Sequence, residues 1–149
     1  MKHIKILILA LGVLTVSAVS AQNSSRLSGK EFKIFINKVE MPGPETQIED
    51  IMTFTGKKVN TQYASARGAK SANFTERLEG DRTLFQMTIT QSNGDVWTFN
   101  GFMEDNHMGG DLTITRSGQA PEAWMFRGMT TQLWDATIQR RDAERQNSY

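Results

Sequence analysis

The stretch FQMTITQSNGDVWTFNG, residues 85–101, decides the fold of this chain. Phe85, Met87 and Ile89 alternate with polar residues, and the alternation resumes after the turn at Asn93-Gly94. A two-residue period is typical of a strand with one buried face. Asn-Gly between two such strands favours a hairpin, because both residues accept positive φ. The stretch therefore predicts two antiparallel strands joined by a tight turn.

Similar alternating segments lie on both sides of this hairpin. We expect strands at residues 32–37, 51–55, 59–64, 72–78, 85–90, 96–103, 112–116 and 122–129, with a polar turn at residues 104–110. Eight short strands separated by turn residues indicate an antiparallel meander, and closing it into a barrel removes the exposed edges. The expected fold class is all-β, an eight-stranded antiparallel up-and-down barrel.

The two ends of the chain differ from this pattern. Residues 1–21 have a positive start, an apolar run too short to span a bilayer, and small residues Val19 and Ala21 before Gln22, which predicts a cleaved signal peptide. Residues 22–129 would then form the barrel. Residues 130–149 lack Gly and Pro, so we expect a short helix that packs on the barrel through Trp134 and its neighbours and frays from residue 140 onward.

Composition limits the classes of function. The chain contains no cysteine, so disulfides and thiol chemistry are excluded, and an exported domain of this kind is typical of a bacterial periplasm or exterior. Loss of Lys2 and Lys5 with the signal peptide would turn the net charge of +1 into −1. A near-neutral domain lacks the basic face that nucleic-acid binding needs. The one small basic cluster in the sequence comprises residues 67–70 with Arg77 and Arg82.

One short motif, Trp-x-Phe-x-Gly, occurs twice. It begins at Trp97 and again at Trp124, and in each copy the period of two places the three residues on one strand face. The aromatic rings would point into the barrel, and the glycine would let a neighbouring side chain approach closely. The same rings could fill a core or line a ligand pocket, and the sequence leaves both readings open.

Seven short landmarks follow one another in a characteristic order along the chain. They are DIMTF (residues 50–54), Gly56, Ser92-x-Gly94, Phe99-x-Gly101, GDL (110–112), GQAP (118–121) and FRG (126–128). In this order the chain resembles small secreted bacterial proteins with a lipocalin-like, calycin-type barrel. The resemblance implies an eight-stranded barrel able to hold one small ligand, and it implies little chemistry. The Gly-x-Trp that opens the first strand of true lipocalins is replaced by Gly29-Lys30-Glu31-Phe32.

No pattern in the sequence points to catalysis, and we expect no catalytic residue, metal or cofactor. His107 is the single histidine after residue 21, and its acidic neighbours match neither a zinc site nor a calcium loop. No serine lies in Gly-x-Ser-x-Gly. Adjacent carboxylates such as Glu49-Asp50 point to opposite faces of a strand, so they make poor acid–base pairs.

Two functional hypotheses follow. The first is a non-catalytic exported barrel that binds a small, largely apolar ligand in its mouth. The second is a protein-interaction module, such as an inhibitor or partner of an exported enzyme, that acts through its loops or through the tail around Trp134. Neither requires nucleic acid or a membrane span. The candidate ligand-binding residues are those expected to point inward: Phe85, Met87, Ile89, Trp97, Phe99, Leu112, Trp124 and Phe126.

Overall fold

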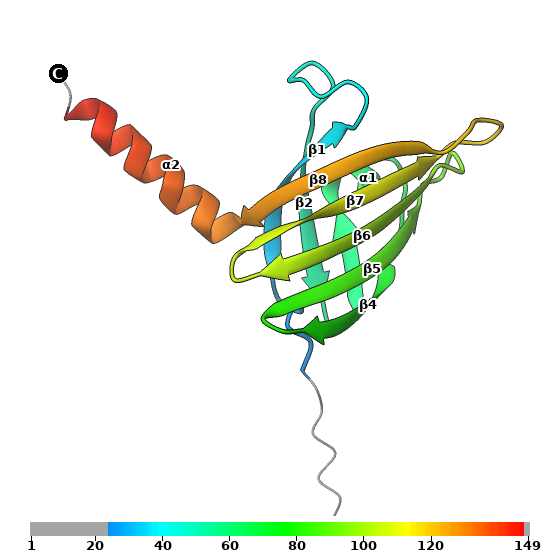
Figure 1. Cartoon of the computed structure of the whole chain (residues 1–149), viewed down its shortest axis with the longest axis horizontal. Coiled ribbons are helices and arrows are strands. Elements are labelled where there is room, and N and C mark those ends of the chain that lie inside the picture. Colours follow the sequence, from blue (N-terminus) through cyan, green and yellow to red (C-terminus); the bar gives the residue numbers. More distant parts are fainter. Residues whose placement is uncertain (1–23, 148–149) are drawn as a thin grey trace, which may run out of the picture.

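The computed structural model describes residues 24–147 and shows a closed antiparallel barrel in which each strand pairs with the next and β8 pairs with β1 (Figure 1). This confirms the expected fold class. The predicted signal peptide lies outside the described residues. The strands are β1 (Glu31–Lys38), β2 (Ile48–Thr55), β3 (Lys58–Thr61), β4 (Ala72–Glu79), β5 (Arg82–Thr90), β6 (Val96–Glu104), β7 (His107–Thr115) and β8 (Glu122–Thr130), with helices α1 (Gln62–Ser65) and α2 (Thr131–Gln146).

The hairpin predicted from residues 85–101 is formed by β5 and β6. Met87 pairs with Phe99 and Ile89 with Trp97, so the apolar residues of both strands share the inner face. Gly94 adopts a φ of 90°, and its N–H donates to the carbonyl of Gln91 in the connecting turn. Positive φ carries no steric cost for glycine, which explains how the chain reverses here.

β2 and β5 each begin three residues earlier than expected, and three further boundaries differ as follows. Residues 62–64 were expected in a strand but belong to α1, because the Thr61 side chain accepts the Ala64 N–H and caps a helical turn. Residues 107–110 were expected in a turn but begin β7. Asp105, at a φ of 54°, allows a turn of only two residues between β6 and β7, so the strand starts at His107. β8 includes Thr130, so the tail helix starts at residue 131.

The Trp-x-Phe-x-Gly motifs point their three residues into the barrel, as expected. A Cβ at Gly101 would lie 2.5 Å from the Phe85 ring and 2.7 Å from the Phe126 ring. A Cβ at Gly128 would lie 2.2 Å from the Lys33 carbonyl oxygen on β1. The first glycine makes room for aromatic rings, and the second lets β8 approach β1, where the barrel closes.

Two chain segments close the ends of the barrel. At the lower end in Figure 1, where the described chain begins, Leu27 is fully buried. The Gly29 N–H donates to the Phe54 carbonyl, and the Phe54 N–H donates to the Lys30 carbonyl, which ties this segment to β2. The opposite end, called here the α1 end, is covered by α1, whose Ala64 is fully buried. The Tyr63 ring stacks on the inward-facing Trp97, with centroids 5.2 Å apart. The two segments thus cover much of the core at each end, and an opening remains beside the N-terminal segment at the lower end.

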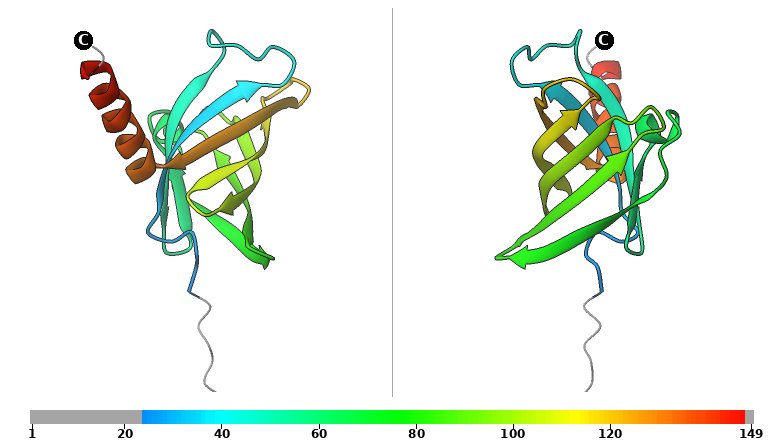
Figure 2. Two further views of the ribbon diagram at one scale, coloured as in Figure 1. Left: turned by 60° about the vertical axis from the view of Figure 1, so that its left-hand side comes forward. Right: turned by 90° about the vertical axis from the view of Figure 1, so that its right-hand side faces the viewer.

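Helix α2 leaves the barrel as an arm and points away from the wall, as Figure 1 and the left view of Figure 2 show. It contains no buried residue, and the main ring contact at its base joins Trp134 to Phe35, with centroids 5.3 Å apart. Packing on the barrel, expected through Trp134, is thus limited to the base of the helix, since its second half is polar and has no apolar face to bury. The helix continues to Gln146, although residues from 140 onward were expected to fray.

Candidate functional site

The structure brings all eight predicted ligand-binding residues together in the barrel interior. Their exposed fractions range from 0% for Ile89 and Phe99 to 8% for Trp124. A void wide enough for water would leave part of their surface accessible, so the low exposures show that these side chains fill the space between them. Ring contacts link Phe85, Phe99 and Phe126 at centroid distances of 5.3–6.1 Å. The aromatics of the repeated motif act here as core.

Beneath α1, one carboxylate is buried among these apolar residues. Asp50, on the inner face of β2, is 4% exposed, and its Oδ1 accepts the N–H groups of Ile51 and Tyr63 at 2.8 Å. Asp50 thereby holds the first turn of α1 against the barrel. Its Oδ2 has no hydrogen-bond partner among the described residues, and the same is true of the Nε2 of Gln91 at the end of β5. Glu49 points outward to Lys33, so the pair Glu49-Asp50 is split between faces as expected.

Burial raises the pKa of the Asp50 carboxyl above its ordinary 3.8, while hydrogen bonds, from the Tyr63 N–H foremost, act in the opposite direction. The folded protein thus holds this proton more tightly than the unfolded chain. The stabilisation is complete below pH 3.8 and is lost as the pH rises through the folded-state pKa. We expect the free energy of unfolding of the wild type, relative to Asp50→Asn, to fall as the pH rises from about 3 and then to level off.

Urea unfolding of both proteins across this pH range measures the difference. Asparagine keeps the acceptor at Oδ1, so the folded contacts with α1 are retained. Asp111→Asn, on the exposed outer face of β7, is the matched control. If the free energies of unfolding of the wild type and Asp50→Asn differed by the same amount at every pH, the raised pKa of Asp50 would be contradicted.

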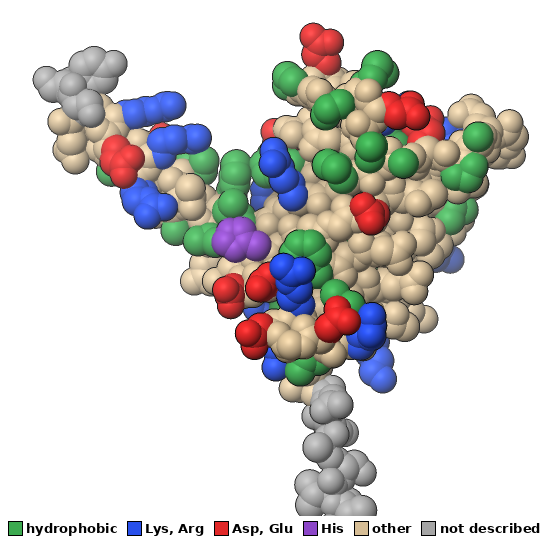
Figure 3. Space-filling model, in the orientation of Figure 1, with side chains coloured by type: hydrophobic (Ala, Val, Ile, Leu, Met, Phe, Trp, Pro, Cys, Tyr) green, Lys and Arg blue, Asp and Glu red, His purple; other side chains and the backbone are tan. Residues whose placement is uncertain are grey.

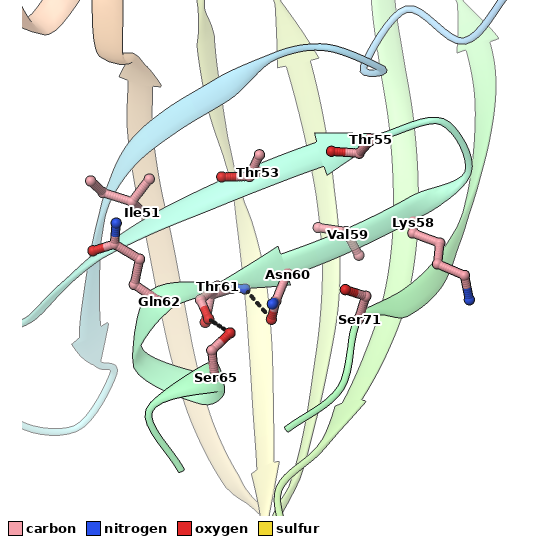
Figure 4. Close-up of a pocket in the computed structure, with 10 residues that line it drawn as sticks. All are labelled: Ile51, Thr53, Thr55, Lys58, Val59, Asn60, Thr61, Gln62, Ser65 and Ser71. Atoms are coloured by element: carbon pink, nitrogen blue, oxygen red, sulfur yellow. Dashed lines mark hydrogen bonds between the residues drawn. The ribbon is translucent and has the colours of Figure 1, made fainter. Parts of the chain in front are cut away.

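Figure 4 shows a polar groove of about 410 Å³ along the outer face of β2 and β3, bounded by α1. Its hydroxyls come from Thr53 and Thr55, together with Ser65 and Ser71. Several of its polar groups are used internally. Ser65 donates to the Thr61 carbonyl, and the Thr61 N–H donates to Asn60. The Thr53 hydroxyl donates to Glu31, and the Lys58 ammonium donates to Asn73. Among the lining residues only Ile51 and Val59 are apolar, so the groove is mainly a polar, solvated strand face.

A second outer groove of about 710 Å³ crosses β4 to β7. Polar Gln86 and Asn100 lie opposite each other across β5 and β6, beside the half-buried Phe102. The Phe102 ring already packs over Gly109 and carries the Arg82 guanidinium at 4.8 Å. Its best apolar surface is therefore covered by the protein itself.

The largest cavity described, about 1090 Å³, opens at the lower end and is called here the mouth cavity. The β4–β5 hairpin and the β2–β3 turn end on either side of the N-terminal segment, and both views of Figure 2 show this arrangement. The cavity lies between these elements. Its lining residues are Ser24, Ser25, Arg26, Ser28, Gly56, Lys57, Phe74, Thr75, Glu76, Arg77, Leu78 and Thr83.

The inner face of β4 supplies the apolar wall of the mouth cavity. Phe74 continues the aromatic core, with its centroid 5.0 Å from that of Phe54. Leu78 lies two residues beyond Glu76 on the same face, opposite Thr83 of β5, yet it is 56% exposed. Thr83 itself is 2% exposed, and its hydroxyl has no hydrogen-bond partner among the described residues. The cavity thus combines an uncovered apolar side chain with an unused buried hydroxyl.

Other residues considered from the sequence lie apart from this cavity. His107 is exposed at the start of β7, opposite Glu104, and residues 24–147 contain no group of three or more side chains suited to a metal ion. Arg127 points outward as expected, but no ion pair joins it to another residue in the described part of the chain. The mild basic cluster is divided, since Arg67 stacks on Tyr63 at the α1 end while Arg77 and Arg82 lie at the lower end.

Fold and site together describe a small up-and-down β-barrel with a filled interior and an open cavity at one end. Comparison with protein-family models, with curated proteins and with solved structures gives no match for the chain. In the part of the chain that the structure describes, neither helix has the length and apolar character to cross a membrane. Function must therefore be argued from the residues themselves.

The sequence predicted a ligand in the barrel mouth, but the eight candidate residues belong to the core and none of them lines the mouth cavity. Gly56-Lys57-Lys58 was interpreted only as a turn, and residues 24–28 were assigned no role. Leu78 was the one indication of this cavity in the sequence. Phe74, Glu76 and Leu78 are spaced two apart on one strand, so Leu78 must lie on the inner face at the end of the barrel. The contribution of residues 24–28 could not be found from periodicity, since they belong to no strand.

Proposed function

We propose that this protein is a non-catalytic, exported binding protein that holds a small, largely apolar ligand in the mouth cavity. The observation that carries this proposal is the cavity of about 1090 Å³, whose wall includes an apolar side chain, Leu78, that is 56% exposed. Ligand sites are concave and mostly apolar, with few polar groups that fix orientation, and their volumes reach about 1,000 Å³. Phe74 and Leu78 supply the apolar contact here and the Thr83 hydroxyl a polar one, while the rest of the lining is mostly polar or charged.

The filled interior supports the mouth as the site rather than the centre of the barrel. A ligand placed among Phe85, Phe99 and Phe126 would have to displace side chains that are each at most 4% exposed. Such overpacking costs roughly 1–3 kcal/mol or more. The mouth cavity requires no such displacement, so the same apolar contact is gained there at lower cost.

Titration with prodan, a neutral fluorophore whose emission depends on polarity, tests this proposal. We expect saturable binding with a shift of the emission to shorter wavelength. Leu78→Ser should weaken it about fivefold, because covering the exposed half of a leucine contributes about 1 kcal/mol. The matched control is Val39→Ser, which removes another half-exposed aliphatic side chain from the loop between β1 and β2 at the opposite end.

The proposal fails if prodan gives no saturable change, or if Leu78→Ser and Val39→Ser affect binding equally. A chain that ends at Thr130 provides a second control, because α2 contributes no residue to the cavity. This shortened chain should bind prodan with unchanged affinity.

A second candidate function, docking of a protein partner on α2, is favoured by one specific observation. The helix stands away from the barrel with no buried residue, and nearby Met125 on the outer face of β8 is 48% exposed. Partner binding through this arm would be lost in the chain that ends at Thr130, whereas prodan binding would survive. The shortened chain therefore separates the two candidates.

A further inference from the structure

Resting on the proposed function, we propose that the mouth cavity selects ligands with an anionic head group, so that its ligand is a single-chain anionic amphiphile. The apolar chain would lie along Phe74 and Leu78, and the head group would lie at the rim near Arg26 and Lys57. This inference concerns which ligand is preferred, and it adds charge recognition to the apolar contact argued above.

The rim carries an excess of positive charge. Arg26, Lys57 and Arg77 line the cavity, and the single acidic side chain among the lining residues is Glu76. No ion pair or hydrogen bond in the described structure engages the side chains of Arg26 or Lys57. Arg77 lies 3.9 Å from Glu79, and both side chains are exposed. Two cations are thus unpaired at the rim, and Figure 3 shows Lys and Arg side chains at this lower end beside acidic ones.

The one acidic side chain of the lining is already held by donors. The Oε2 of Glu76 accepts the hydroxyl of Ser25, and its Oε1 accepts the N–H of Arg26, both at 3.1 Å. These bonds tie the N-terminal segment to β4 and occupy both oxygens of the carboxylate. Glu76 therefore acts as a structural link across the cavity, and it leaves the charges of Arg26 and Lys57 available to a ligand.

Hydrogen-bond donors in the cavity match the same ligand chemistry. The Ser28 hydroxyl accepts the Gly56 N–H at 2.9 Å, which leaves its own O–H free to donate. Thr83 places a second hydroxyl against the cavity, 98% buried and without a partner in the described residues. An anionic head group with several acceptor oxygens satisfies donors and cations together, whereas an ammonium head group satisfies neither.

Isothermal titration with three probes of equal chain length tests the inference: decanoate, decan-1-ol and decyltrimethylammonium, all below their micellar concentrations. We expect decanoate to bind about tenfold more tightly than decanol, in keeping with two partly exposed cations, and the ammonium probe to bind most weakly. Added salt should reduce the preference for decanoate and leave decanol binding unchanged.

The double variant Arg26→Gln/Lys57→Gln should bind decanoate and decanol equally, with its affinity for decanol unchanged. Its matched control is Lys70→Gln/Arg141→Gln, which removes two cations far from the cavity and should keep the preference. Equal affinity of the wild type for all three probes, or a preference for the ammonium probe, would overturn the inference but leave the proposed function standing. Absence of binding by all three would refute the proposed function as well.

Discussion

Gly128→Ala is expected to lower the free energy of unfolding by about 3 kcal/mol, at the upper end of the usual cost of overpacking. The added Cβ would lie 2.2 Å from the carbonyl oxygen of Lys33 and 2.9 Å from the Cα of Ile34. Both atoms belong to the backbone of β1, so no side-chain rotation can relieve the clash. Gly128 pairs with Ile34 in the seam between β8 and β1, and the substitution would force apart the two strands that close the barrel.

Urea unfolding followed by tryptophan emission measures this loss. Gly43→Ala is the matched control, because a Cβ at Gly43 meets no atom within 4 Å and its backbone is not in the left-handed region. We expect the control to unfold within about 0.5 kcal/mol of the wild type. If the two variants proved equally stable, the close approach of β8 to β1 could not be correct.

Phe99→Ala is expected to cost about 3–5 kcal/mol, the range for removing a buried phenylalanine from a packed core. Phe99 is fully buried, and its ring meets Phe126 edge-on with centroids 5.3 Å apart. Neighbouring backbone is fixed by pairing on both sides of β6, so the site has little freedom to collapse. The residual cavity should be apolar and dry, and it should bind benzene, which the filled wild-type interior should not.

Thermal unfolding with and without benzene provides both readouts. Phe35→Ala is the control for loss of an aromatic ring outside the core, since Phe35 lies on the outer face of β1 against Trp134. Benzene should raise the melting temperature of Phe99→Ala alone. If benzene stabilised the wild type equally, the barrel interior would not be filled as described.

The sequence alone was sufficient to predict the barrel and its interior residues because both depend on local periodicity. The apolar residues are spaced two apart in the segments Phe85 to Ile89 and Trp97 to Gly101. Successive side chains of a strand point to opposite faces, so this spacing places all of them on the buried face. The turn after Thr61 is a different case. A cap formed by one hydroxyl overrides the strand pattern of residues 62–64, and β-propensity does not register such a contact.

The candidate site could be predicted only in part, because its residues come from segments distant in the chain. Arg26 and Lys57 line the same cavity only once β2 and the N-terminal segment are in place, and no spacing in the sequence reveals this. Whether inward aromatics form a core or a pocket depends on packing rather than on pattern. Gly101 illustrates the point, since the space it leaves is taken by Phe85 and Phe126.

The most direct test of the binding proposal is an NMR titration of the amide-labelled protein with decanoate. We expect saturable shifts at residues 24–28, at Lys57 and along residues 74–83, with little change at Ile89, Trp97 and Trp124 deeper in the barrel and at the α1 end. Saturable shifts at Ile89, Trp97 and Trp124, with residues 24–28 unmoved, would contradict the proposal and place the ligand in the barrel interior.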